Sequence, residues 1–339
     1  MPLSGLPSFI NDRLLRRFDV KLVRRSWLEG FAHSAGASSS GLDSSSAALP
    51  PVRKISTIAE LDTTLKEVES ARLVSDDAML AAFQTFEFYP PLHDLPGDPF
   101  SKEYSDYQFA LYSAIAGKPY QIANEITNWL SVEDYVKCPY PYYTGSYQIV
   151  SEQLIMIGLI LKTLQLPPGA KILEFGAGYG NTTLALAQTG YEVTVIDIEQ
   201  RFLDIITARC AELKNPPRAI CADFNAIENL QDTYDAILFY GCFHHCSDHQ
   251  RLASQFAPRL NPGGQVMFAA EPIADFFTMP WGLRLDGQSL WAVRNNGWLE
   301  LGFTERYFTE LMAKHKFTLQ KYQYPVTALG NIFVARQEA

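Results

Sequence analysis

The residues best suited to acid–base chemistry lie in the second half of the chain. His244 and His245 are neighbours in the loop 241–249, which follows an apolar stretch, and Glu271 ends the next apolar stretch. An unperturbed imidazole titrates near neutral pH, so either histidine suits the role of a general base. Glu271 could serve as the base instead, or it could bind a substrate.

The same loop concentrates residues that commonly ligate metals, namely Cys242, His244, His245, Cys246, Asp248 and His249. Zinc sites usually draw pairs of ligands from two separated stretches of a chain. The remaining histidines, at positions 33, 93 and 315, form no second cluster. We therefore expect no metal site.

A different kind of site is indicated by three glycines at alternate positions between 176 and 180. They follow the apolar stretch 171–175, which is predicted to be a buried strand, and they precede a helix that Asn181 or Thr182 is expected to cap. Alternating glycines let the backbone turn tightly and approach a ligand closely. The free N–H groups at the start of the helix would face the same ligand.

Two acidic residues extend this site. Asp197 ends the stretch 192–197, the expected second strand of a βαβ unit, where a carboxylate would bind a ribose diol. Asp223 follows a shorter predicted strand at 218–221. Dinucleotide sites use Gly-x-Gly-x-x-Gly, which seats a pyrophosphate on the helix, whereas this chain has Gly-x-Gly-x-Gly. The spacing disfavours an NAD-dependent oxidoreductase, which is kept as an alternative.

Glu174 and the glycines together give the pattern (D/E)-x-G-x-G-x-G, which resembles motif I of class I S-adenosylmethionine-dependent methyltransferases. The segment 222–224 matches the family's adenine-contacting acidic position, 235–241 its fourth strand, and 260–268 its L-x-P-G-G turn and fifth strand. The resemblance covers 166–339, about half of the chain. It implies an α/β, Rossmann-like sheet of seven mostly parallel strands with an antiparallel last strand. It also implies S-adenosyl-L-methionine as the cofactor and S-adenosyl-L-homocysteine as the product.

The resemblance further implies which residues contact the cofactor. The glycines would approach its methionine part, Asp197 the ribose and Asp223 the adenine amine. The region before motif I often folds over the cofactor in this family, so the tyrosines of segment 138–147 are candidate lid residues. Paired histidines after the fourth strand often only shape the cofactor pocket, so a catalytic role for them stays open. The expected cofactor-binding residues are Glu174, Phe175, Gly176, Ala177, Gly178, Gly180, Asp197, Ile198, Asp223, Phe224, Tyr240 and Tyr143.

An insertion at 274–303 is the expected acceptor site, because it follows the fifth strand at the ligand-binding edge of the sheet. It holds three of the five tryptophans, with arginines and asparagines interleaved. Aromatic faces beside planar hydrogen-bonding groups suit sugar rings and anionic glycans. A weaker similarity to bacterial methyltransferases encoded with surface-polysaccharide genes points the same way. The alternative is a small hydrophobic core under a long loop. The expected acceptor-binding residues are Arg284, Asp286, Trp291, Arg294 and Tyr147.

The elements that must position these residues alternate between strand and helix from position 171 onward. Such alternation implies a largely parallel sheet with helices on both faces. The region 53–165 is predicted to be helical, to include the lid, and to contain a helix that runs through Phe88. Residues 166–339 would form the cofactor-binding domain.

The N-terminal part differs from the rest in charge. The chain carries a net charge of −9, yet residues 1–55 hold eight Lys/Arg against four Asp/Glu, which leaves twenty against thirty-three elsewhere. An acidic body is a poor ligand for nucleic acid. We expect residues 1–35 to be a basic arm docked on the protein's own acidic surface, with peripheral membrane contact as the alternative. Residues 36–52 are expected to be a Ser-rich flexible linker.

Composition favours a cytoplasmic enzyme. The chain of 339 residues is 47% hydrophobic, shows no apolar run of the roughly 18 residues that a membrane helix needs, and has five irregularly spaced cysteines. We expect a methyltransferase that acts on an oxygen of a small molecule or glycan. A non-catalytic cofactor-binding scaffold is the further alternative.

Overall fold

The computed structural model describes residues 52–74, 76–90, 94–126, 130–137, 147–327 and 330–338. The predictions for the basic arm, for nearly all of the linker and for Tyr143 lie outside these residues.

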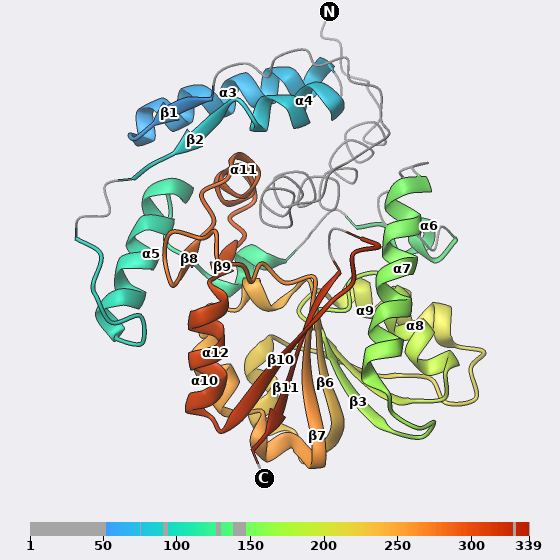
Figure 1. Ribbon diagram of the computed structural model, residues 1–339. Coiled ribbons are helices and arrows are strands. Elements are labelled where there is room, and N and C mark those ends of the chain that lie inside the picture. The colour runs from blue at the N-terminus through green and yellow to red at the C-terminus, as the bar shows by residue number, and fades with distance from the viewer. Residues whose placement is uncertain are drawn as a thin grey trace, which may run out of the picture.

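A seven-stranded sheet forms the centre of the protein, in the order β10-β11-β7-β6-β3-β4-β5 (Figure 1). The five strands from β3 to β7 pair in parallel, whereas β11 is antiparallel to both β7 and β10. The predicted sheet of mostly parallel strands with an antiparallel last strand is therefore confirmed. The strands are β3 (Lys171–Phe175), β4 (Glu192–Asp197), β5 (Arg218–Cys221), β6 (Tyr234–Tyr240), β7 (Leu260–Ala269), β10 (Phe317–Gln323) and β11 (Asn331–Gln337).

Helices cover both faces of the sheet, as the alternation predicts. Successive side chains of a buried strand point to opposite faces, so Ile172 packs with one group of helices and Leu173 with the other. The first group is α7 (Tyr147–Leu164), α8 (Asn181–Gln188) and α9 (Gln200–Cys210), and the second is α10 (His249–Ser254) and α12 (Glu305–Lys314). In the part of the chain that the structure describes, every helix is too short or too polar to cross a bilayer.

An aromatic stack runs across the middle of the sheet. The rings of Phe175, Phe239 and Phe268, on the adjacent strands β3, β6 and β7, lie face to face with centroids 5.1 and 5.4 Å apart. Each such pair contributes about 0.5–1.5 kcal/mol beyond its buried area. The stack fixes the strands close to the points where the β3 and β6 loops begin.

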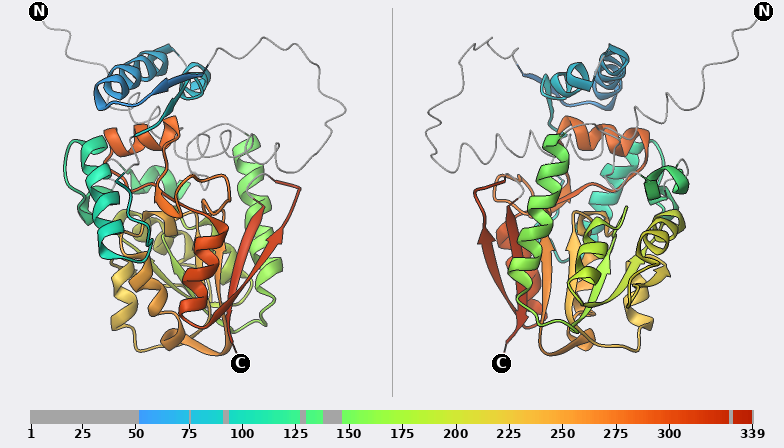
Figure 2. Two further views of the ribbon diagram at one scale, coloured as in Figure 1. Left: turned by 60° about the vertical axis from the view of Figure 1, so that its left-hand side comes forward. Right: turned by 90° about the vertical axis from the view of Figure 1, so that its right-hand side faces the viewer.

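The N-terminal region lies over the carboxyl edge of the sheet (Figures 1 and 2). The predicted helical character of this region is confirmed, but two short strands that were not predicted also pair there in parallel. The helix expected to run through Phe88 ends at Phe83, because Phe86 and Phe88 are buried on either side of an exposed Glu87, which is a strand pattern. The elements are β1 (Arg53–Ile55), α3 (Ile58–Val74), α4 (Asp76–Phe83), β2 (Phe86–Phe88), α5 (Lys102–Ala116), η1 (Ile122–Glu125) and α6 (Val132–Lys137).

The insertion folds against this N-terminal region. It contains β8 (Trp281–Leu283), α11 (Gly287–Asn295) and β9 (Leu301–Phe303), with β8 and β9 antiparallel. The Tyr104 hydroxyl on α5 donates to the Trp281 carbonyl at 2.8 Å. Side chains of both regions belong to one hydrophobic core that continues to the sheet. The insertion therefore joins the N-terminal region to the cofactor domain.

Candidate functional site

The three glycines of the turn after β3 have two different structural roles. All three have positive φ, at 59° for Gly176, 52° for Gly178 and 74° for Gly180. A Cβ on Gly176 would lie 2.5 Å from Cys242 Cβ, and one on Gly180 would lie 2.3 Å from Ile206 Cγ1. A Cβ on Gly178 would meet nothing within 4 Å. The turn is therefore tightly packed at both ends and open to a ligand in its middle.

Helix α8 begins directly after this turn. Its cap residue is Gly180, which provides no side-chain cap, so the prediction that Asn181 or Thr182 caps the helix is wrong. The Asn181 amide instead donates to Gln153 Oε1 at 3.0 Å. A helix start without a side-chain cap leaves its first N–H groups for water or a ligand.

Asp197, at the end of β4, ties the glycine turn to the neighbouring strand. One of its carboxylate oxygens accepts the Gly178 N–H at 3.0 Å and the other accepts the Glu199 N–H at 2.9 Å. Burial raises the pKa of Asp197 to about 6, although both backbone donors favour the charged form. Each oxygen keeps a further lone pair, so a ribose diol can still bind there. Ribose binding stays a prediction.

Two other predicted cofactor contacts, Asp223 and Phe224, follow strand β5. Asp223, after β5, accepts the Asn225 N–H at 2.8 Å and caps the short helix η3 (Phe224–Asn229). The Phe224 ring lies 5.7 Å from that of Phe175, beneath the start of the glycine turn. An adenine contact at Asp223 stays a prediction. Ala177, Ile198 and Tyr240 lie in the turn, directly after β4 and at the end of β6.

Glu174 is enclosed on the α8 side of β3. It accepts the Thr183 hydroxyl at 2.6 Å and is 1% exposed. Burial raises the pKa of Glu174 to about 7. The observed contact of this residue is thus with helix α8, and its predicted contact with the cofactor stays a prediction.

Glu271 organises the loop after β6. Its Oε1 accepts the N–H groups of Cys242 and Phe243, both at 2.8 Å, and its Oε2 accepts that of His244 at 3.2 Å. Oε2 also lies 2.9 Å from His244 Nδ1. This carboxylate faces donors on all sides, so we assign the ring proton of His244 to Nδ1 and its lone pair to Nε2. Burial and the neighbouring His245 lower the pKa of His244.

Two glutamates from distant stretches complete a cluster at this loop. His245 Nδ1 lies 3.4 Å from Glu125 Oε2, and His244 Nε2 lies 3.8 Å from Glu300 Oε2. Burial disfavours a charged His245, but Glu125, Glu300 and Glu271 outweigh it and raise the pKa to about 9. Neither Glu125 nor Glu300 could be predicted from the sequence, because a single carboxylate outside a motif carries no recognisable pattern.

The rest of the loop is packed inside the protein. His249 is 1% exposed, and its Nε2 lies 2.7 Å from the Tyr307 hydroxyl. Burial lowers the pKa of His249 to about 3, so its ring is neutral. Cys242 Sγ donates to the Phe175 carbonyl at 3.1 Å, and burial raises the pKa of both the Cys242 and the Cys246 thiols. Of the potential ligands in this loop, only the two adjacent histidines face the cluster described above.

Arg284 of the insertion is paired inside the protein. It is 2% exposed, and its guanidinium lies 3.2 Å from carboxylate oxygens of both Asp286 and Glu300. Its Nη2 is buried without a hydrogen-bond partner. Because the same Glu300 faces His244, Arg284 connects the insertion with the histidine cluster.

Trp291 and Arg294 join the insertion to the N-terminal helices. Trp291 is 4% exposed and its Nε1 donates to Glu69 Oε1 at 2.6 Å. Arg294 lies 2.8 Å from Asp62 Oδ1 and donates to the Ile115 carbonyl at 2.9 Å. The enclosed Trp291 ring is not available to stack on an acceptor, because the N-terminal helices already cover it. For the remaining predicted acceptor contact, Tyr147, the structure describes only the backbone, at the start of α7.

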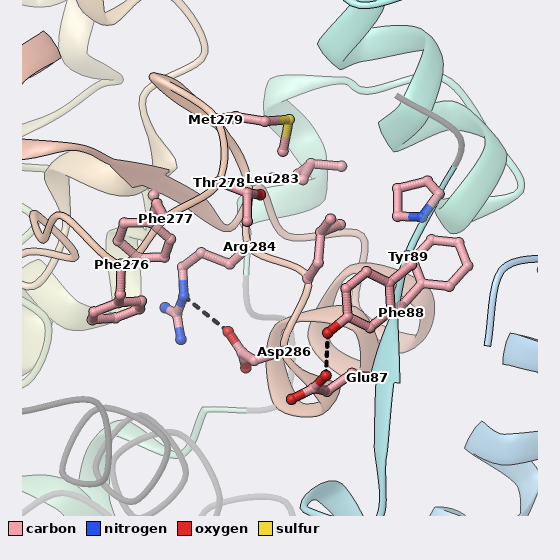
Figure 3. Close-up of a pocket in the computed structure, with 14 residues that line it drawn as sticks. Glu87, Phe88, Tyr89, Phe276, Phe277, Thr278, Met279, Leu283, Arg284 and Asp286 are labelled. Atoms are coloured by element: carbon pink, nitrogen blue, oxygen red, sulfur yellow. Dashed lines mark hydrogen bonds and ion pairs between the residues drawn. The ribbon is translucent and has the colours of Figure 1, made fainter. Parts of the chain in front are cut away.

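A pocket of about 290 Å³ lies between the insertion and the segment that begins with β2 (Figure 3). Its walls are mainly apolar and include Phe276, Phe277 and Met279, while Arg284 and Asp286 supply polar groups. Small-molecule sites commonly combine an apolar wall with a few placed polar groups. Since Arg284 belongs to the pocket and also contacts Glu300, the pocket and the histidine cluster are neighbours.

The strand order and the open glycine turn define an α/β domain with a nucleotide-type cofactor site at the carboxyl edge of its sheet. Comparison with known proteins identifies part of this domain. Residues 172–264 match the family model described as a methyltransferase domain.

Curated relatives are similar over part of the chain. Demethylmenaquinone methyltransferase of Tropheryma whipplei (strain Twist) is 35% identical over 107 residues, which are 31% of this chain and 44% of the relative. Ubiquinone biosynthesis O-methyltransferase of Coxiella burnetii (strain Dugway 5J108-111) is 26% identical over 101 residues, 30% of this chain and 43% of the relative. The chain thus spans less than half the length of these relatives.

Solved structures are similar at lower identity. The 1,6-didemethyltoxoflavin-N1-methyltransferase of Burkholderia thailandensis, with S-adenosylhomocysteine bound, is 20% identical with a TM-score of 0.42, over 61% of this chain and 87% of that one. The magnesium protoporphyrin IX methyltransferase of Synechocystis PCC 6803, also with S-adenosylhomocysteine bound, is 16% identical with a TM-score of 0.39. The match covers 56% of this chain and 82% of that one.

The matched region is therefore a methyltransferase domain, and its sheet has the strand arrangement predicted from the resemblance to class I methyltransferases, whose cofactor is S-adenosyl-L-methionine. The side chains present fit that cofactor. Gly178 leaves space beside the turn, α8 starts without a side-chain cap, and Asp197 keeps free lone pairs next to both.

Proposed function

We propose that this protein transfers a methyl group from S-adenosyl-L-methionine to a hydroxyl oxygen of a small, largely apolar molecule. One observation carries the proposal: the glycine turn and the histidine loop touch each other. The Cys242 thiol donates to the Phe175 carbonyl at 3.1 Å, and Gly176 leaves no room for a Cβ beside Cys242. The expected cofactor position at Gly178 and the ring of His244 therefore belong to loops in direct contact.

The protein's part in this reaction is positioning and proton removal. When bound, S-adenosyl-L-methionine supplies a methyl group that its sulfonium already activates. A hydroxyl acceptor must lose its proton, and His244 accepts it at Nε2 because Nδ1 is held by Glu271. Glu271 is thus a positioning residue. A positioned base of this kind raises the reaction rate by a factor of about 10²–10⁴.

The pocket beside Arg284 is the proposed acceptor site. Phe276, Phe277 and Met279 suit an apolar body, and Arg284 with Asp286 suits a polar substituent. A glycan is less well supported, because Trp281 and Trp291, expected to face a sugar, are buried and hydrogen-bonded. The names of the two curated relatives agree with an apolar acceptor, and the second name agrees with transfer to oxygen.

Turnover tests the proposal. The full chain is incubated with S-adenosyl-L-methionine and a panel of phenols and hydroxylated apolar compounds, and S-adenosyl-L-homocysteine is quantified by mass spectrometry. We expect turnover with at least one compound. The turnover rate of the His244→Ala variant should be lower by a factor of about 10²–10⁴, while its calorimetric affinity for the cofactor is unchanged.

His315→Ala is the matched control. It also replaces a histidine by alanine, but His315 lies at the C-terminal end of α12 and not in the histidine loop. It should keep the parent's turnover. Cofactor binding without turnover on any compound would instead indicate a scaffold, and preferential binding of NAD would indicate an oxidoreductase. Equal turnover of parent and His244→Ala would remove the base from the proposal.

A further inference from the structure

We infer that His244, His245 and Glu300 form a binding site for one divalent transition-metal ion, with Zn²⁺ as the leading candidate. The three side chains come from two stretches of the chain, the short helix η4 (Phe243–His245) and the residue before β9. Each offers one potential ligand atom, and these atoms all lie within 4.8 Å of one another. The site differs from the sequence expectation because its carboxylate comes from the end of the insertion and not from a second histidine or cysteine pair.

The spacing is close to that of a loaded site. Ligand atoms that each lie about 2.0–2.2 Å from Zn²⁺ in a tetrahedron are about 3.4 Å apart. His244 Nε2 and Glu300 Oε2 are 3.8 Å apart, too far for a hydrogen bond and slightly wider than this ligand spacing. The imidazole rings of His244 and His245 lie side by side, with centroids 4.2 Å apart. Shifts of under about 1 Å would bring the three atoms around one ion.

Each ring has a carboxylate beside its Nδ1, as metal-binding histidines usually do. A ligating imidazole commonly donates its other N–H to a carboxylate, which fixes the tautomer and raises the basicity of the ligand nitrogen. His244 Nδ1 faces Glu271 at 2.9 Å and His245 Nδ1 faces Glu125 at 3.4 Å. Nε2 of His244 is therefore left for an ion, and the His245 ring offers it one nitrogen.

Glu300 is held by an outer partner as well. Arg284 Nη1 lies 3.2 Å from Glu300 Oε2, and Asp286 fixes the guanidinium from its other side. Glu300 as a residue is 8% exposed, and its side chain enters the cluster from the insertion. It is therefore confined to one orientation, as a metal ligand requires.

The charge balance of the cluster favours an added cation. Glu125, Glu271 and Glu300 all face the two imidazoles, and Arg284 is already shared between Glu300 and Asp286. When an ion is bound, both rings are neutral, and the remaining carboxylates form a net negative, largely buried group that would be costly without the charge of the ion. A divalent ion supplies that charge, and a proton on His245 is its competitor.

The ligand set selects the class of ion. Imidazole nitrogens with one carboxylate suit Zn²⁺, Fe²⁺ or Ni²⁺, whereas Mg²⁺ and Ca²⁺ prefer sites made of oxygen. Three protein ligands leave a position open, which is typical of catalytic sites. If the proposed function holds, the ion would occupy Nε2 of His244 and take over its role by lowering the pKa of the acceptor hydroxyl, whose proton would then pass to solvent water. Metal binding itself does not depend on that function.

Calorimetry on the full chain tests the site directly. The protein is purified without a histidine tag, stripped with a chelator, dialysed and titrated with ZnCl₂, and then with Co²⁺, whose visible absorption reports its ligands. We expect one ion per chain. His245→Ala and Glu300→Gln should each weaken binding at least a hundredfold. Glu125→Gln, which changes the outer partner of His245 but keeps an oxygen that can accept the Leu299 N–H, should weaken it about 10–100-fold.

His315→Ala controls for binding by other histidines and should leave the affinity unchanged. His245 is partly exposed, so its variant tests the site even if Glu300→Gln folds poorly, and near-UV circular dichroism checks the fold of each protein. No stoichiometric binding by the parent, or equal binding by parent and His245→Ala, would overturn the inference. Turnover that persists in stripped protein would leave the methyltransferase proposal standing without the metal. Stoichiometric binding without turnover would support the metal site and contradict the proposed function.

Discussion

The two loops that meet at the carboxyl edge of the sheet are held in place by different forces. After β3, backbone conformation sets the geometry: Gly178 has a positive φ and its N–H is bound by Asp197 at 3.0 Å. After β6, buried charge sets it: Glu271 holds the backbone and His244, while Glu300 enters from the insertion. The first arrangement lies within a short stretch of chain, whereas the second is assembled from distant stretches. The first therefore depends on few residues, and the second on many.

The largest effect on stability is expected from Arg284→Ala, which tests whether charge holds the second loop. The change leaves the carboxylates of Glu300 and Asp286 without their cation. Breaking a buried pair of this kind costs about 3–5 kcal/mol. Urea unfolding measures the loss. Arg306→Ala is the control, because Arg306 is exposed and pairs with Glu310 across one turn of α12, so this variant should stay near the parent in stability. Equal stability of both variants would show that the second loop is not held by charge.

Asp197→Ala tests the first loop in the same way. Loss of a charged acceptor for the ribose and for the Gly178 N–H should weaken cofactor binding by about 2–3 kcal/mol. Calorimetry with S-adenosyl-L-methionine measures this as a loss of tens-fold or more. Asp204→Ala, on the exposed side of α9, serves as the control. An affinity equal to the parent's would remove Asp197 from the ribose site.

The stability of the first loop should depend on pH through Glu174. Burial raises its pKa from 4.5 to about 7, so the folded protein holds a proton that the unfolded chain releases. The corresponding stability is present below pH about 4.5 and is lost as pH rises toward 7. In Glu174→Gln the free energy of unfolding should depend less on pH, and its change over this range should be smaller by on the order of 2 kcal/mol. Asp197, whose pKa is also raised, keeps part of the slope. Identical slopes in urea unfolding from pH 5 to 7 would contradict this.

Arg294→Ala should have the smallest effect. The ion pair of Arg294 with Asp62 is about one third exposed, and such pairs contribute about 1 kcal/mol or less. We expect a small loss of melting temperature and unchanged acceptor kinetics. A raised KM for the acceptor at unchanged cofactor affinity would instead return Arg294 to the acceptor site, where its sequence position first suggested it.

The sheet was predictable because its signals are local. Apolar stretches of five to seven residues, separated by glycine turns and capping residues, define β3, β4 and β6 without any knowledge of their partners. The strands β1 and β2 were missed because three residues carry too short a pattern. Phe86 and Phe88 form a strand only because β1 lies beside them, and that pairing is a long-range fact.

The same distinction explains the site. The glycines and Asp197 can be identified from spacing alone, because each takes its place from the strand next to it. Trp291 was assigned to an acceptor on composition, but its partner Glu69 lies in α3, far away in the sequence. Glu125 and Glu300 belong to no motif at all. Their importance follows only from the fold, which brings them to the two histidines.

Cofactor affinity of two leucine variants tests the central claim most directly. Gly178 and Gly169 both have positive φ, at 52° and 89°, and a Cβ at either would meet nothing within 4 Å, so leucine should strain the backbone at Gly169 at least as much as at Gly178. Only Gly178 lies in the turn proposed to face the cofactor. We predict that Gly178→Leu loses calorimetric affinity for S-adenosyl-L-methionine by at least a hundredfold, while Gly169→Leu stays within about twofold of the parent despite a similar loss of melting temperature. Equal affinities in the two variants would contradict the assignment of the glycine turn as the cofactor site.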